Sequence, residues 1–308
     1  MSALPPPDGD TAASYRHVDV FADAPFHGNG LVVAFCGTLD VEAEQLRRVA
    51  EEMRQFETIF LGPVGADGTT VRARIFTVEE ELPFAGHPVV GAAAALHERV
   101  AADAPDAEWC FLIQDRPLRV VSHRDDAYYG ATMDQGIPEM SPPQNDRRRE
   151  LATALNLTLD DLAPLPLQVI STGLPYLIVP VAGGALVRAR ISTGDFESVL
   201  ASVGAKFVYV LDAEQREGRT WDNSGDVEDV ATGSAAGPAA AYLHLHRLAD
   251  PGEPLRLAQG RFVGRPSSIT VTRADDGHLW VGGPVRPVAS GTFDGFPGAE
   301  GSASVLGY

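Results

Sequence analysis

The stretch at residues 81–97 constrains the fold of this chain more than any other. It reads Glu-Leu-Pro-Phe-Ala-Gly-His-Pro-Val-Val-Gly and continues through four alanines. The pattern predicts a strand end, a tight turn at Gly86, and a helix with Pro88 at its first position, where the missing N–H is tolerated. Because the helix has no polar face before Glu98, we expect it to be buried at the centre of a domain. Its N-terminus would offer unpaired N–H groups and the positive end of the dipole to an anion.

A second segment, residues 229–243, repeats this design. It has a turn at Gly233, a polar residue, Ser234, directly after it, and an alanine-rich apolar helix. Gly237 follows this turn much as Gly91 follows the first one. Two weakly similar halves, each with its own central helix, are the simplest explanation of the repeat. We expect the two helix N-termini to converge on one cleft that binds a carboxylate.

Length and charge narrow the class of protein. A chain of 308 residues suits two domains of about 150 residues, each with its own core. A net charge of −18 argues against binding to nucleic acid or to anionic membrane surfaces. The apolar runs are much shorter than the roughly 20 residues that span a bilayer. Residues 1–14 lack a basic start and an apolar centre, so they are predicted to be a disordered leader rather than a signal peptide, and we expect a cytoplasmic location.

The two cysteines do not indicate a metal site. Cys36 and Cys110 lie in apolar surroundings and lack the spacing of metal ligands. We predict that both are buried thiols on strands.

Glu57 is the acid that stands out. It belongs to a predicted strand at residues 55–61 and is surrounded there by Phe56, Ile59 and Phe60. Burying a carboxylate is costly unless its pKa rises or it gains a partner. Two interpretations remain open from the pattern alone. Glu57 points outward from a half-exposed strand, or it is a general acid/base with a raised pKa.

Other segments give a coarse outline of the chain. Residues 41–54 have helical spacing with acids early and arginines late, and residues 71–76 alternate as a strand does. Asn29, between two glycines, fits either a plain hairpin connection or an amide placed in a cleft. Residues 136–145 are rich in proline and glycine, so they are the predicted linker.

Together these residues resemble the PhzF family, within the diaminopimelate-epimerase-like superfamily. The resemblance covers nearly the whole chain, from about residue 15 to 290, and its Leu-Pro-Phe-Ala-Gly-His-Pro string is highly specific. The matching stretches are residues 18–21, 28–29, 57–58, 74–77, 81–88, 172–175, 228–229, 231–235, 259–260 and 264–267.

The resemblance implies an α+β fold of two pseudo-symmetric domains, each a mixed, barrel-like sheet around a central helix. We expect an N-terminal domain at residues 15–135, a C-terminal domain at residues 146–295 with final strands able to exchange between domains, and a loose tail at residues 296–308. The resemblance also implies a homodimer that needs no metal and no organic cofactor.

The family pattern assigns roles to particular residues. Its type reaction isomerises a dihydro-hydroxyanthranilic acid by shifting a proton along a conjugated system, and one carboxyl group can act first as base and then as acid. The resemblance implies that the substrate is a small carboxylic acid, held by backbone N–H groups at both turns. The resemblance implies the catalytic residues Glu57, His87 and Asp229 and the substrate-binding residues Asn29, Gly86, Gly233 and Ser234.

Three positions depart from the pattern of the phenazine enzymes. Phe56 replaces a small serine before the acid, Val230 replaces a proline after Asp229, and Gly30 replaces a proline after Asn29. Phe56 would reshape the pocket unless it points the other way on the strand. A family branch that isomerises unsaturated alkyl-proline intermediates in antibiotic pathways is therefore an alternative.

Rival interpretations come from other classes. A racemase of the superfamily would carry a cysteine at each turn, but Ala85 and Thr232 stand near those positions. A non-catalytic binding protein on the same fold would not need the acid/base Glu57. An oxidoreductase is disfavoured because no Gly-x-Gly-x-x-Gly follows a strand.

Overall fold

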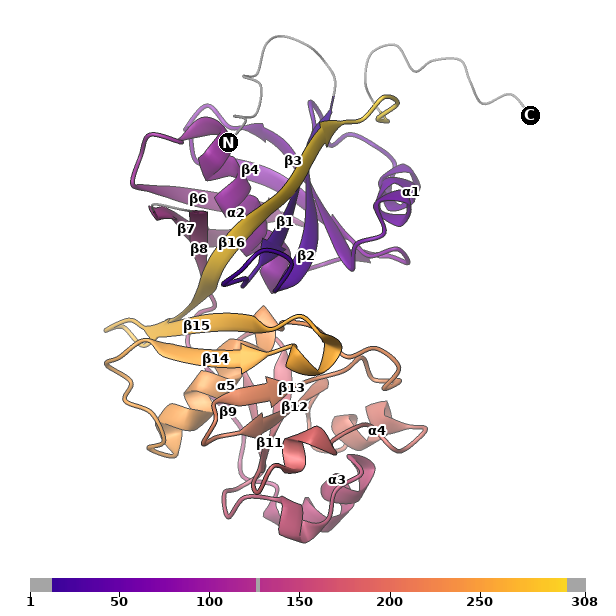
Figure 1. The fold of residues 1–308 in the computed structure, drawn as a ribbon, viewed down its shortest axis with the longest axis vertical. Coiled ribbons are helices and arrows are strands. Elements are labelled where there is room, and N and C mark those ends of the chain that lie inside the picture. Colours follow the sequence, from indigo (N-terminus) through magenta and orange to yellow (C-terminus); the bar gives the residue numbers. More distant parts are fainter. Residues whose placement is uncertain (1–12, 126–127, 298–308) are drawn as a thin grey trace, which may run out of the picture. The chain divides into compact units, whose positions relative to one another are not determined.

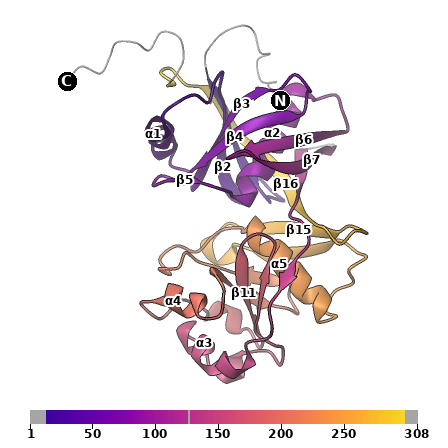
Figure 2. The ribbon, with the colours of Figure 1, turned by 180° about the vertical axis from the view of Figure 1, so that it is seen from behind.

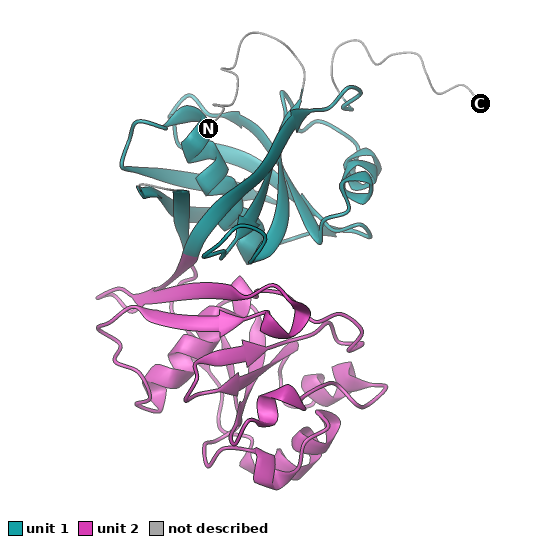
Figure 3. Cartoon of the chain, viewed as in Figure 1, with its two compact units in different colours: residues 1–133, 283–308 teal, residues 134–282 magenta. Residues whose placement is uncertain are grey.

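The computed structural model describes residues 13–125 and 128–297 and divides into two compact units (Figure 3). Unit 1 combines Met1–Met133 with Gly283–Tyr308, and unit 2 is the continuous stretch between them. The sequence prediction puts residues 283–295 in the second domain but allows its final strands to exchange between domains, and the contacts group these residues with unit 1. Most of the expected leader lies outside the described residues. Its boundary at residue 14 is wrong, because Ser14 already begins the first strand.

Unit 1 is a closed barrel built from eight of the described strands (Figure 1). The order is β1–β2–β3–β4–β6–β7–β8–β16, and it closes because β16 pairs with β1. The sheet is mixed, since β2 and β3 pair in parallel, as do β4 and β6. The elements are β1 (Ser14–Val20), β2 (Asn29–Phe35), α1 (Ala43–Met53), β3 (Glu57–Val64), β4 (Thr70–Phe76), β5 (Glu81–Leu82), α2 (Gly86–Val100), β6 (Asp106–Ile113), β7 (Arg116–Asp125), β8 (Tyr128–Asp134) and β16 (Leu279–Thr292).

Helix α2 runs through the barrel and contacts β1, β2, β3, β6 and β7 (Figure 1; Figure 2). Every residue from Gly86 to His97 is buried, as the absence of a polar face predicts. Pro88 is the third helical residue and not the first, because the helix already begins at Gly86. The helix loses no hydrogen bond through this shift, since none of the first four N–H groups has a partner within a helix.

Helix α1 confirms the helix predicted at residues 41–54 and forms an outer layer on the barrel. Successive residues of β3 point to opposite faces, so Phe60 packs outward with Leu46 of α1 while Ile59 points the other way. Phe296 belongs to the same cluster, 6.1 Å from the Phe60 ring. The predicted loose tail is therefore wrong at Phe296, which is buried. Residues 298–308 of that tail lie outside the described part.

Unit 2 is a mixed sheet that curls about helix α5. Its strand order is β15–β14–β13–β12–β11–β10–β9, and α5 contacts β10, β11, β12 and β15. The expected linker at residues 136–145 contains β9, which pairs with β10, so it contributes to this sheet. The elements are β9 (Glu139–Met140), η1 (Asn145–Arg147), α3 (Arg148–Ala154), η2 (Leu159–Asp161), β10 (Gln168–Ser171), β11 (Pro175–Val181), η3 (Ala185–Val187), α4 (Phe196–Ala201), β12 (Phe207–Asp212), β13 (Glu217–Arg219), α5 (Gly233–Leu245), β14 (Leu255–Gln259), η4 (Arg261–Val263) and β15 (Ser267–Arg273).

Helix α5 repeats the burial of α2. It begins at Gly233, so Pro238 lies inside the helix. Nearly all of its first eleven residues are buried, with Ser234 as the half-buried exception. Among the described residues, no helix has the length and apolar content to cross a membrane.

Candidate active site

Glu57 is buried in unit 1, with 6% of its surface exposed. It is the first residue of β3 and lies opposite Leu31 of β2. By the two-residue period of a strand, it faces the same side as Ile59, away from α1 and toward the barrel interior. The outward-pointing interpretation of Glu57 is therefore wrong.

His87 is the partner of Glu57. It is the second residue of α2, and its Nε2 lies 3.0 Å from Glu57 Oε2. Burial lowers the pKa of His87 to about 3, because removing the imidazolium from water outweighs the attraction of the neighbouring carboxylate. At neutral pH the ring is uncharged, so the contact joins a neutral imidazole to a carboxyl group.

Asn29 determines which nitrogen of His87 carries the proton. The Asn29 amide nitrogen lies 3.4 Å from His87 Nδ1. Since the amide nitrogen can only donate, Nδ1 accepts and the proton of the neutral ring is on Nε2, facing Glu57. Asn29 is also the first residue of β2, directly after a turn at Gly28, whose φ is +70°. The hairpin interpretation of this turn is confirmed, and the Asn29 amide lies buried against His87. Its place in a substrate cleft stays a prediction.

The N-terminus of α2 adds donors beside this pair. Ala85 precedes the helix and supplies no side-chain cap, so the first N–H groups, that of Gly86 included, are not satisfied by a capping side chain. Such groups, together with the helix dipole, favour a negatively charged ligand or a developing negative charge. The predicted residues Asn29, Glu57, Gly86 and His87 thus come together in unit 1.

Asp229 organises the corresponding turn in unit 2. Its carboxylate accepts a hydrogen bond of 2.5 Å from the Thr232 hydroxyl and a longer one, 3.4 Å, from the N–H of Ala231. The side chain is half-buried, and Thr232 is the residue that precedes α5. Asp229 therefore ties its own loop to the start of the helix that contains Gly233 and Ser234.

Gln259 holds this turn from the neighbouring strand, and sequence reasoning did not single it out as a site residue. It is almost fully buried at the end of β14. Its amide oxygen accepts from the N–H of Thr232 at 3.2 Å, and its amide nitrogen donates to the carbonyl of Asp229 at 2.9 Å. The only signal in the sequence was its place in the family string Gln-Gly.

Glu228 anchors the other side of the turn. Arg219 donates to both of its carboxylate oxygens, at 2.9 and 2.6 Å, and the two side chains are about 10% exposed. A bidentate arginine–carboxylate pair of this kind restricts the orientation of both side chains in addition to neutralising their charges. The residue directly before Asp229 is thereby fixed in place.

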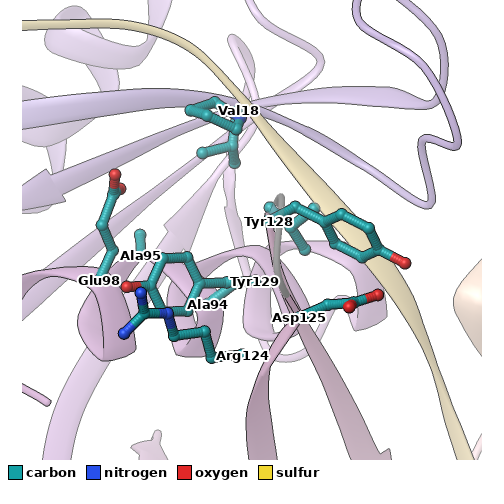
Figure 4. A pocket seen from close by; sticks show the side chains of 10 residues that line it. Val18, Ala94, Ala95, Glu98, Arg124, Asp125, Tyr128 and Tyr129 are labelled. Atoms are coloured by element: carbon teal, nitrogen blue, oxygen red, sulfur yellow. The ribbon is translucent and has the colours of Figure 1, made fainter. Parts of the chain in front are cut away.

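A pocket in unit 1 lies along the other half of α2 (Figure 4). Its volume is about 70 Å³, and its floor includes Ala94 and Ala95. Glu98 at its edge is already paired with Arg16 through two hydrogen bonds. None of the predicted site residues lines this pocket. In the ranges 13–125 and 128–297, no group of three or more His, Cys, Asp or Glu could hold a metal ion.

Comparison with known proteins places this geometry in a family. The PhzC-PhzF family model, described as phenazine biosynthesis-like protein, matches residues 18–279. The chain belongs to this family. An uncharacterized isomerase of Escherichia coli is 33% identical over 270 residues, covering 83% of this chain and 88% of that protein. The trans-2,3-dihydro-3-hydroxyanthranilate isomerase of Pseudomonas aeruginosa is 33% identical over 269 residues, with the same coverage.

Solved structures support the fold. A structure described as that of a predicted epimerase from P. aeruginosa is 47% identical, with a TM-score of 0.84, and covers 92% of this chain and 99% of its own. A hydroxyproline epimerase from Agrobacterium vitis shares the fold alone, with 12% identity, a TM-score of 0.57, and coverage of 92% and 91% of the two chains. The predicted family, the epimerase-like α+β fold and the enzyme class, isomerase, are confirmed.

Proposed function

We propose that this PhzF-family isomerase shifts a proton along a conjugated, unsaturated carboxylic acid without a cofactor, with Glu57 as the acid/base. The observation that carries the proposal is the buried contact of 3.0 Å between Glu57 and the neutral His87. A carboxyl group in such surroundings can take a proton from carbon as base and return it further along the substrate as acid.

His87 supports both steps in this scheme. The His87 Nε2–H lies 3.0 Å from Glu57 Oε2 but is not aligned for a hydrogen bond in this structure. We infer that a small turn of the ring lets it donate to the carboxylate form of Glu57 and stabilise that form. When Glu57 becomes protonated, the same N–H is free to turn toward charge on the substrate. The Asn29 amide keeps the ring in this tautomer throughout.

The remaining predicted residues are proposed to bind substrate. The N–H groups at Gly86 and at Gly233 and Ser234 suit a carboxylate, because each set begins a buried helix without a side-chain cap. Asp229 is proposed to contact a polar group of the substrate, because its half-buried carboxylate lies directly before the turn that begins α5.

The substrate we favour is trans-2,3-dihydro-3-hydroxyanthranilate, on which relatives at 31–33% identity are named as acting. The alternative is an unsaturated alkyl-proline carboxylate. Phe56 stands directly before Glu57, where the phenazine enzymes carry a small residue, but it is exposed whereas Glu57 is buried. Phe56 therefore does not share the barrel interior with Glu57 and gives no support to the alternative substrate. A non-catalytic binding role is a weaker candidate, because burial of a Glu–His contact costs free energy that binding alone does not require.

The test is turnover in D₂O by the wild-type protein and Glu57→Gln, followed by NMR and mass spectrometry. We expect wild type to convert the substrate and to incorporate up to one deuterium at the carbon that receives the proton, to the extent that the proton held by Glu57 exchanges with solvent before it is returned. Glu57→Gln should lose about 10²–10⁴-fold in rate while staying folded. Glu108→Gln is the matched control, since its side chain is 67% exposed on the barrel surface. Retained activity in a folded Glu57→Gln protein would contradict the mechanism. If the protein turns over only the unsaturated alkyl-proline carboxylate, that acid takes the place of trans-2,3-dihydro-3-hydroxyanthranilate as the proposed substrate.

A further inference from the structure

Tyr176 stands beside the proposed ligand site of unit 2 without any role assigned to it. It lies near the start of β11, and only 3% of its surface is exposed. Its hydroxyl is 2.8 Å from the hydroxyl of Ser234, the second residue of α5. Its ring also packs against Phe207 of β12, with ring centroids 5.4 Å apart. The ring packing and the hydroxyl hydrogen bond together fix the orientation of the phenol.

The two hydroxyls differ in what each can do. A phenol is more acidic than a serine hydroxyl, with an ordinary pKa near 10, so it is the better donor of the pair. If Tyr176 donates, the Ser234 oxygen accepts and its own hydrogen turns away from the phenol. Hydrogen bonds in such a chain polarise one another, which strengthens the outer donor.

Ser234 is well placed to use that hydrogen. It is half-buried, whereas Gly233 before it and Ala235 after it are buried. Thr232 supplies no side-chain cap to α5, since its hydroxyl oxygen accepts from the Gln259 amide and its hydrogen is donated to Asp229. A ligand at this helix end would therefore meet backbone N–H groups and the Ser234 hydroxyl together.

We propose that Tyr176 is a positioning residue, whose hydroxyl orients Ser234 O–H as a donor to the carboxylate of the ligand. This inference rests on the proposed function, since it assumes that α5 receives the carboxylate. Tyr176 itself touches no reacting atom. It sets affinity for the carboxylate and has little effect on the proton shift.

The experiment is a double-mutant cycle of Tyr176→Phe and Ser234→Ala, in which calorimetry measures dissociation constants. The ligands are two unreactive acids, 3-hydroxyanthranilate and pyrrole-2-carboxylate, and each acid is compared with its neutral carboxamide. Tyr176→Phe is expected to weaken binding of the acid about three- to tenfold, and binding of the amide by less. In the Ser234→Ala background the same change should have no further effect. Tyr242→Phe is the matched control, since it also removes one buried hydroxyl bond of α5, to the carbonyl of Pro166.

Several results would overturn the inference. The first is that Tyr176→Phe weakens binding of the acid as much in the Ser234→Ala background as in the wild type, and the second is that it does not weaken binding at all. The third is that Tyr176→Phe weakens binding of the acid and of the amide equally. The fourth is that the wild type binds neither acid. If Tyr176→Phe does not fold, 3-fluorotyrosine at position 176 replaces it in the cycle. Its more acidic phenol should strengthen binding of the acid in the presence of Ser234 and not in Ser234→Ala, and an equal effect in both backgrounds would overturn the inference. Turnover is measured separately. Absent turnover with an intact cycle overturns the proposed proton shift, but it leaves the carboxylate site at α5 standing, and this inference with it.

Discussion

At the scale of single residues, buried His87 makes the stability of the fold depend on pH in one direction. Its pKa is about 3 in the folded protein and about 6.5 in an unfolded chain. Between these values the unfolded state binds the extra proton, so the free energy of unfolding falls as pH falls from 6.5 toward 3. The slope from this residue is at most about 1.4 kcal/mol per pH unit. Urea unfolding of wild type and His87→Asn at pH 4, 5, 6 and 7 measures it, and the variant should show the shallower slope.

His278 provides a control of opposite sign. Its hydrogen bond with Asp134 raises its pKa above 6.5. Its contribution is therefore complete below pH 6.5 and is lost as the pH rises through the folded pKa. His278→Asn should lower stability at pH 6 more than at pH 9. Equal pH profiles for wild type and both variants would contradict the assigned pKa directions.

The residues that could be read from the sequence are those with a local signal. Glu57 stands out as an acid in an apolar strand, and His87 and Ser234 follow glycine turns before apolar helices. Gln259 and Tyr176 give no such signal. Their hydrogen bonds reach partners 27 and 58 residues away, and only the folded sheet brings these residues together.

At the scale of elements, Gly91 shows why α2 is built from small residues. A Cβ atom at this position would lie 2.4 Å from Leu31 Cδ2 and 2.8 Å from Val20 Cγ2, both fully buried. Alanine favours a helix over glycine by about 1 kcal/mol, but overpacking a core costs about 1–3 kcal/mol. We expect Gly91→Ala to be destabilised by up to about 2 kcal/mol, as measured by urea unfolding.

Gly37→Ala is the matched control for this prediction, because a Cβ there meets no atom within 4 Å. It should leave stability unchanged or slightly raised. A Gly91→Ala protein more stable than wild type would mean that the barrel interior can relax around a methyl group.

The elements themselves were largely predictable, and their start points were not. The apolar stretches correctly predicted both central helices. The sequence pattern predicted Pro88 as the first helical residue, but the helix begins at Gly86 and Pro88 is the third. Proline is tolerated anywhere in the first turn, so its presence cannot fix the first residue.

At the scale of the whole molecule, unit 2 is an insertion between two paired strands of the chain. The N–H of Gln135 donates to the carbonyl of Leu279 at 2.8 Å, and the N–H of Leu279 donates to Gly136 at 2.9 Å. The chain thus leaves β8 and returns in β16 at neighbouring positions. The pattern of β16 alone could not reveal this return, because alternation shows a strand without naming the strands that it pairs with. Only the family resemblance implied that the final strands can exchange between domains.

This connectivity predicts what a minimal barrel requires. Residues 13–136 alone leave the β1 edge unpaired where β16 belongs, and they open the barrel around apolar α2. We therefore expect this fragment to aggregate or to unfold without cooperativity. The same fragment joined through a short glycine linker to residues 278–297 should unfold cooperatively in urea, as followed by circular dichroism.

Val285→Asp in the joined fragment is the control. Val285 is buried and lies opposite Val20 of β1, so a carboxylate there should abolish the cooperative unfolding that residues 278–297 restore. Cooperative unfolding of residues 13–136 alone, with the midpoint of the joined fragment, would show that β16 is dispensable to the barrel.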